Sequence, residues 1–299
     1  MAKLSRKERM FLKKAISDLY AKTTPCKCSR KTQKNIVDLW DFFDVPVAKK
    51  IRYNSPDETE VWVARLLALQ YAVISLGVDC EKSPEQYVYS GLFETISNTI
   101  VAIMRLAEDG LDYQAMALIR NLFELYMTLI IVTDSPEKRE AFIAAHEPEN
   151  AREVWHRYFT KNKFSKMLKT FCADRLNSEN ISEIVQTWID DNYGELSSYA
   201  HNDYAHIICC SRSQDDANGY SHPNIWGNYV TWQRTIYRQL FAVAWPAHLL
   251  LTYILKDPSV DVSIEYLWGN NNATPPKEMF VEIQNLIIDL GTDAILSPL

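Results

Sequence analysis

The sequence predicts an all-α protein: a multi-helix bundle with a basic helical arm at its N-terminus. Of 299 residues, 47% are hydrophobic and 23% are charged, which suffices for a sizeable core and excludes general disorder. The chain has 8 Gly, where average composition gives about 20. This scarcity argues against Gly-rich nucleotide-binding α/β folds and against turn-dense β sandwiches. The sequence has no Walker, GxGxxG or GxSxG motif, which removes the commonest P-loop, Rossmann and serine-hydrolase interpretations.

Charge divides the chain into a basic arm, residues 1–56, and an acidic bundle core, residues 57–299. Residues 1–34 hold 11 basic side chains and two acidic ones, a net charge of +9, so the rest of the chain carries −15. We expect two short helices in the arm, at 4–20 and 33–44. A basic arm on an acidic body can bind nucleic acid, an anionic surface or the acidic body itself.

Start and stop signals define the helices of the core. Ser83 before Pro84 is a cap followed by Pro at the first helical position, and Gly110 ends the helix that starts there. The polar segment 211–225 predicts a loop, no convincing strand is found, and Pro246 predicts a kink. The expected helices span 58–78, 85–108, 111–133, 134–146, 149–160, 162–175, 179–191, 194–208, 226–256 and 277–291, with 85–108, 111–133 and 226–256 at the centre of the bundle.

Cysteine spacing and hydropathy predict a cytoplasmic protein without a membrane span. The six Cys do not resemble a secreted disulfide framework. No apolar stretch of about 7 to 15 residues follows the N-terminal charges, so no signal peptide is predicted. The most apolar run, Phe241 to Leu255, is shorter than the roughly 20 residues of a span and contains Pro246 and His248. We interpret it as a core helix.

The helix expected over 111–133 carries an ion pair on an otherwise apolar surface. Arg120 and Glu124 are four residues apart and share one face. One interpretation is an internal salt bridge that fixes packing, for which Arg120→Ala would cost about 3–5 kcal/mol because Glu124 is left buried alone. The other is a polar cleft that keeps the pair for chemistry or binding.

Further polar residues accompany this pair. Asn121 follows Arg120 directly, and Glu94 and Asn98 interrupt the apolar helix expected over 85–108. Two neighbouring antiparallel helices could bring Glu94 and Asn98 near the pair, so all three are candidate substrate-binding residues. Polar contacts between helices also specify register, and that alternative stays open.

A histidine follows in the segment from Tyr193 to His206. His201 is flanked by Tyr199 and Asn202, which we take as candidate substrate-binding residues. Histidine is the natural general acid or base near neutral pH. A lone histidine at a helix end also serves as a cap, so a structural role remains an alternative.

Three short elements resemble a bacterial helical family of unknown function: Arg120-Asn-Leu-Phe-Glu124, Asp134-Ser-Pro-Glu and Leu196-Ser-Ser-Tyr-Ala-His201. Members of that family show an R-x3-E helix and a later L-S-x-[YF]-x-H element. They are similar to HEPN-type effectors, which cut RNA without a metal in toxin–antitoxin and phage-defence systems. The resemblance covers about residues 60–255.

The resemblance implies roles for three residues. His201 would be the general acid or base, Arg120 would stabilise the phosphate, and Glu124 would orient Arg120 or His201. In HEPN proteins the arginine and histidine stand in one helix with four to six residues between them. Only Arg139 and His146 have that spacing here.

Other constellations are weaker. Glu153 and His156 form one E-x-x-H, where a ferritin-like di-iron site needs two. Arg234 and Arg238 stand four apart among aromatic residues, a pattern that fits nucleic-acid binding and equally the packing of an amphipathic helix. Asp215-Asp216 without further ligands is typical of a polar turn. No metal or cofactor is predicted.

The leading functional hypothesis is a bacterial defence or toxin-type effector that acts as a metal-independent endoribonuclease. Its expected partners are RNA at the basic arm, a partner protein from the same system, and further copies of the chain in a homodimer or larger oligomer. The alternative is a non-catalytic sensor or binding module for a small ligand, nucleic acid or partner protein. A di-metal helical oxidase is a third interpretation.

Overall fold

The computed structural model describes residues 58–78, 84–145, 147–173, 179–201, 212–215, 220–223, 233–256 and 277–296. The predicted basic arm, residues 1–56, lies outside these residues. In the described part nearly every residue is helical, so the all-α prediction is confirmed.

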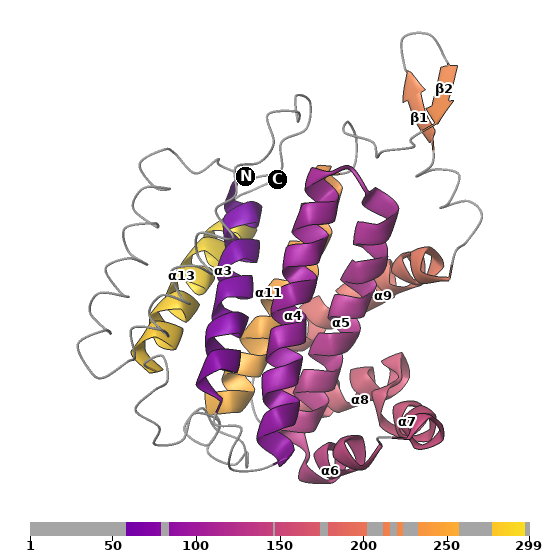
Figure 1. Ribbon diagram of the computed structural model, residues 1–299. Coiled ribbons are helices and arrows are strands. Elements are labelled where there is room, and N and C mark those ends of the chain that lie inside the picture. The colour runs from indigo at the N-terminus through magenta and orange to yellow at the C-terminus, as the bar shows by residue number, and fades with distance from the viewer. Residues whose placement is uncertain are drawn as a thin grey trace.

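The described elements are α3 (Glu58–Gly77), α4 (Pro84–Glu108), α5 (Asp112–Asp134), α6 (Pro136–Ala144), α7 (Pro148–Val154), the π-helical turn η1 (Trp155–Phe159), α8 (Lys161–Phe171), α9 (Glu179–Ala200), β1 (Arg212–Asp215), β2 (Tyr220–Pro223), α11 (Gln233–Lys256) and α13 (Lys277–Leu296). The long helices α3, α4, α5 and α11 form the bundle, and the other helices pack around it (Figure 1). Helix α5 lies between α4 and α11, α3 packs on α4, α13 covers α3, and α9 covers α5.

The helix start and stop signals of the sequence define the hairpin of α4 and α5, as expected. Pro84 opens α4 and the acidic Glu85 occupies its first turn. Gly110 has a φ of 71°, in the left-handed region where a side chain would be strained. This turn lets the N–H of Leu111 donate to the carbonyl of Leu106 at 2.8 Å, and α5 begins at once.

Two sequence predictions are wrong in detail. The expected helices at 179–191 and 194–208 are joined in the structure by α9, which runs without interruption through Gly194. Glycine lowers helix stability by only about 1 kcal/mol, and the buried residues on both sides of it hold α9 on the bundle. Part of the expected loop over 211–225 forms an antiparallel hairpin, in which Arg212 pairs with Pro223 and Asp215 with Tyr220.

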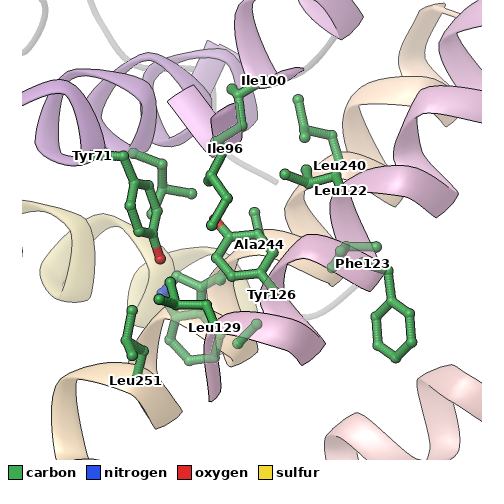
Figure 2. Close-up of a cluster of buried hydrophobic side chains, with 14 of the residues drawn as sticks. Tyr71, Ile96, Ile100, Leu122, Phe123, Tyr126, Leu129, Leu240, Ala244 and Leu251 are labelled. Carbon is green, nitrogen blue, oxygen red and sulfur yellow. The ribbon is translucent and has the colours of Figure 1, made fainter. Parts of the chain in front are cut away.

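The core is built from apolar faces of α3, α4, α5 and α11. Figure 2 shows the centre of this cluster, where the rings of Tyr71 and Tyr126 lie edge to face at 5.6 Å with Leu129 beside them. Helix α5 is long and apolar enough to cross a membrane, but 67% of its most apolar window is buried in the bundle. That burial is typical of a core helix. The predicted core helix Phe241–Leu255 is likewise buried along most of its length, within α11.

A polar network crosses this core and joins three helices. His248 of α11 lies 2.9 Å through Nδ1 from the hydroxyl of Tyr71 in α3, and its Nε2 contacts Oε1 of Gln284 in α13. An amide oxygen only accepts, so Nε2 donates to Gln284, and in the neutral imidazole Nδ1 then accepts from the hydroxyl of Tyr71. Burial lowers the pKa of His248 to about 4, which fits that form.

Candidate functional site

Two side chains of α5, one of α9 and that of His201, the residue after α9, form one hydrogen-bonded cluster. Nη1 of Arg120 lies 3.1 Å from Nε2 of His201, and Nη2 of Arg120 donates to Oε1 of Glu124 at 3.1 Å. The hydroxyl of Tyr193 donates to the same carboxylate oxygen at 3.2 Å. We call Arg120, Glu124, Tyr193 and His201 the Arg120 cluster. The structure therefore brings together the three residues predicted to share a site, which are 81 positions apart at their extremes.

Helical spacing explains why these side chains meet. Arg120 and Glu124 are four residues apart on α5. His201 follows the last residue of α9, and its N–H donates to the carbonyl of Ser197, so it keeps the helical spacing eight residues after Tyr193. Ring contacts hold the two helices together: Phe123 meets Tyr193 edge to face at 5.7 Å, and Tyr113 meets Tyr199 at 5.6 Å. The cluster consequently lies on a packed seam between two long helices, where its geometry is held by the core below.

The Arg120 cluster lies at the edge of the bundle. The side chains of Arg120 and Glu124 retain 16% and 23% exposure, and His201 is exposed. The ion pair is thus half-buried, in contrast to the fully enclosed pair that the apolar sequence of α5 suggested. One face of the site meets solvent, so a ligand can reach His201 without opening the bundle.

The contacts also fix which groups donate. A guanidinium has no acceptor, so Nε2 of His201 accepts from Arg120 and the imidazole is neutral with its proton on Nδ1. Burial raises the pKa of the Tyr193 hydroxyl, the charge of Glu124 raises it further, and Arg120 opposes the shift. Tyr193 therefore stays protonated near neutral pH and serves as a hydrogen-bond donor.

Sequence reasoning missed two members of this surface. One is Tyr193. Its position eight residues before His201, in one helical stretch, is the feature of the sequence that could have indicated it. Lys161, the first residue of α8, is the other: its ammonium lies 5.6 Å from the centre of the Tyr193 ring and 3.4 Å from Asp190. The guanidinium of Arg120 lies 5.4 Å from the same ring centre. Two cations therefore lie against the ring of Tyr193, and one of them, Arg120, also contacts the exposed His201.

The structure does not join the other candidates of α4 and α5 to the cluster. Glu94, Asn98 and Asn121 are exposed, and none of them forms a hydrogen bond or ion pair with a described residue. Glu94 and Asn98 on α4, like Asn121 on α5, lie on the solvated side of their helix. Tyr199 was also predicted to bind substrate. Its side chain is 3% exposed and packs on Tyr113, which favours a structural role.

The remaining candidates divide between structural roles and undescribed positions. Arg238 places Nε 3.8 Å from Oε1 of the buried Glu60, which links α11 to α3. Asn202 and the side chain of Arg234 lie outside the described residues. Glu153 and His156 are both exposed, and no group of His, Cys, Asp and Glu in the described part of the chain is arranged to hold a metal.

Arg139 has a structural contact of its own. Its side chain is 5% exposed and Nη1 donates to the carbonyl of Val132 at 3.3 Å, in the last turn of α5. An arginine there satisfies a helix-terminal carbonyl and complements the helix dipole. His146, its partner in the HEPN-like spacing, lies outside the described residues. The burial of Arg139 favours a capping role over contact with a substrate.

The model of a family of unknown function, DUF5677, matches residues 86–220. That segment contains all four residues of the Arg120 cluster. No curated protein and no solved structure matches the chain. The chain is thus similar, over residues 86–220, to a family of unknown function, which agrees with the predicted resemblance to such a family.

Proposed function

We propose that the chain is a cytoplasmic, metal-independent endoribonuclease of a bacterial defence or toxin system, with the Arg120 cluster as its reactive centre. The observation that carries the proposal is the 3.1 Å contact between the guanidinium of Arg120 and Nε2 of an exposed histidine, His201. A base beside a fixed cation is the minimum needed to activate a hydroxyl and stabilise an anionic phosphate.

In the proposed step the ribose 2′-hydroxyl of RNA is the nucleophile. Nε2 of His201 takes the proton of that hydroxyl while the 2′-oxygen forms a bond to the adjacent phosphorus. The bond from phosphorus to the 5′-oxygen breaks, and that oxygen takes a proton from solvent. The products are a 2′,3′-cyclic phosphate and a 5′-hydroxyl, so atoms and charge balance without a further reactant.

Arg120 exchanges one of its two hydrogen-bond partners in this step, His201, for the substrate phosphate. In the free protein Nη1 of Arg120 donates a hydrogen bond to Nε2 of His201, so the lone pair of that nitrogen is not available to act as a base. A substrate phosphate is a stronger partner for a guanidinium than a neutral imidazole. Its arrival would draw Nη1 onto the phosphate and release Nε2 to act as base. Glu124 keeps Nη2 in place, and Tyr193 holds Glu124 from the other side.

The proposed partners belong to the same function. RNA would be collected by the basic arm, and a partner protein or a second copy of the chain would restrain or complete the effector. The alternative is a non-catalytic sensor or binding module, in which the Arg120 cluster only fastens α9 to α5. The two hypotheses differ in whether the protein cleaves RNA when the Arg120 cluster is intact.

The test is RNA cleavage by the purified wild type and by His201→Ala in the presence of EDTA. His156→Ala is the matched control, because His156 is exposed and lies outside the cluster. We expect fragments with 2′,3′-cyclic phosphate ends from the wild type and the control, and intact RNA with His201→Ala. Equal cleavage by all three proteins, or none by any, would contradict the nuclease and favour the binding module.

A further inference from the structure

A cleft of about 380 Å³ is lined by residues of α6, η1 and α8, away from the Arg120 cluster. Four basic side chains line it, Lys138, Arg157, Lys163 and Lys166, and we call this surface the basic cleft. Figure 1 shows α6, α7 and α8 grouped at one end of α5. The volume falls in the range of small-ligand pockets, about 300 to 1,000 Å³, so the cleft has room for single nucleotide units and none for a duplex.

The cations of the basic cleft are not paired with carboxylates in the part of the chain that the structure describes. One acid, Asp134, shares the lining, and Glu137 accepts a hydrogen bond from the hydroxyl of Tyr158 at 3.1 Å. The whole chain has a net charge of −6. A concave group of uncompensated cations on such a body attracts polyanions.

One of these cations lies over an aromatic ring. The guanidinium of Arg157 lies 5.2 Å from the centre of the Tyr158 ring, and Tyr158 also lines the cleft. A stacked guanidinium binds a phosphate with its N–H groups and offers its plane to a nucleobase. The lysines add flexible point charges suited to backbone phosphates. A nucleotide chain satisfies both kinds of group.

Helix α8 connects the basic cleft to the Arg120 cluster. Phe164, Leu168 and Phe171 are buried and hold α8 on the bundle, and the ring of Phe164 meets Phe123 at 5.9 Å. Lys161 at the start of α8 lies over the ring of Tyr193. Since a helix rises about 1.5 Å and turns about 100° per residue, Lys166 of the cleft lies about 8 Å further along the axis than Lys161 and roughly 140° around it.

We propose that the basic cleft binds the phosphate backbone of a single RNA strand, whose continuation along α8 reaches Arg120 and His201. The ligand class rests on the proposed ribonuclease function, but binding at the cleft does not depend on cleavage. The cleft then acts as a second RNA-contacting surface that sets how far from the bound segment the strand is cut.

The test compares two charge reversals on α8 that change the net charge equally. Lys166→Glu alters the basic cleft, whereas Lys169 is exposed, does not line it and acts electrostatically on Asp190. Each change is combined with His201→Ala in the full chain, and binding of a labelled 12-nucleotide RNA is followed by fluorescence anisotropy at several salt concentrations. The basic arm is the same in both proteins, so their difference isolates the cleft.

We expect Lys166→Glu to weaken binding about fivefold or more and to lower the slope of log K against log salt by roughly 0.7, the value for one single-strand phosphate contact. Lys169→Glu should change affinity by less than about twofold, because exposed charges are screened. Equal losses in both variants, or none in either, would overturn the proposal. So would ATP binding that depends on Lys166 while RNA binding does not.

The outcomes separate the two proposals. RNA binding that depends on Lys166, in a protein whose wild type leaves RNA intact, would support the cleft and reject the nuclease. Cleavage that depends on His201, together with RNA binding that does not depend on Lys166, would support the nuclease and reject the cleft as an RNA-binding site. Melting temperatures of both variants should match that of the parent, since both lysines are exposed.

Discussion

The half-buried position of Arg120 decides what its removal does. Leaving a fully buried charge unpaired would cost about 3–5 kcal/mol, but Glu124 is 23% exposed and keeps the hydroxyl of Tyr193 as a donor. We therefore expect Arg120→Ala to lower the free energy of unfolding by about 1 kcal/mol, as for exposed ion pairs, and to abolish RNA cleavage. Urea denaturation and a cleavage assay on the same preparation measure both effects.

A matched arginine provides the control for this change. Arg105 also pairs with a carboxylate on its own helix, Glu108 at 3.7 Å, and lies outside the Arg120 cluster. Arg105→Ala should cost a similar amount of stability and leave cleavage unchanged. A loss above about 3 kcal/mol for Arg120→Ala, with activity retained, would assign the pair to packing.

Residue patterns predicted the centre of the candidate site but not its boundary. Four-residue spacing on an apolar helix was enough to single out Arg120 and Glu124, and the polar end of the next segment singled out His201. Lys161 could not be found in this way, because its contact depends on how α8 packs against α9. The prediction that Glu94 lies near Arg120 fails for a related reason. A polar stripe shows that a helix has a polar face, but it does not show whether that face turns toward a neighbouring helix or toward solvent.

At the scale of the element, α9 positions His201, the residue after its last one, because the helix continues through Gly194. A Cβ added to Gly194 meets no atom within 4 Å. Gly194→Ala should therefore raise the free energy of unfolding by about 0.5 to 1 kcal/mol, through helix propensity and a less flexible unfolded chain. Cleavage should be unchanged, because the substitution adds no contact.

Gly91 of α4 is the matched position, since a Cβ there also meets no atom within 4 Å. Thermal unfolding should show the same gain for Gly91→Ala. A loss of stability at Gly194 alone would mean that α9 needs a break there, as the sequence first suggested. Glycine is a helix breaker by propensity, and tertiary packing on either side of it decides whether the helix continues.

At the scale of the whole molecule, two buried groups make stability depend on pH in opposite directions. Burial lowers the pKa of His248 from 6.5 to about 4, and burial raises the pKa of the Asp112 carboxyl from 3.8 to about 7. The unfolded chain protonates the histidine first as pH falls, so stability present above pH 6.5 is lost toward pH 4. The folded chain retains the proton of Asp112 as pH rises, so stability present below pH 3.8 is lost toward pH 7.

The two effects oppose each other between about pH 4 and 6.5, and removing one should expose the other. We expect the free energy of unfolding of the wild type to change little across this interval, whereas Asp112→Asn should lose on the order of 3 kcal/mol as pH falls through it, because His248 then acts alone. The variant should be more stable than the wild type at pH 7 and equally stable near pH 4, where Asp112 is largely protonated in the folded state. Urea unfolding at pH 4, 5.5 and 7 measures this, and parallel pH profiles for the two proteins would show that Asp112 is ionised in the fold.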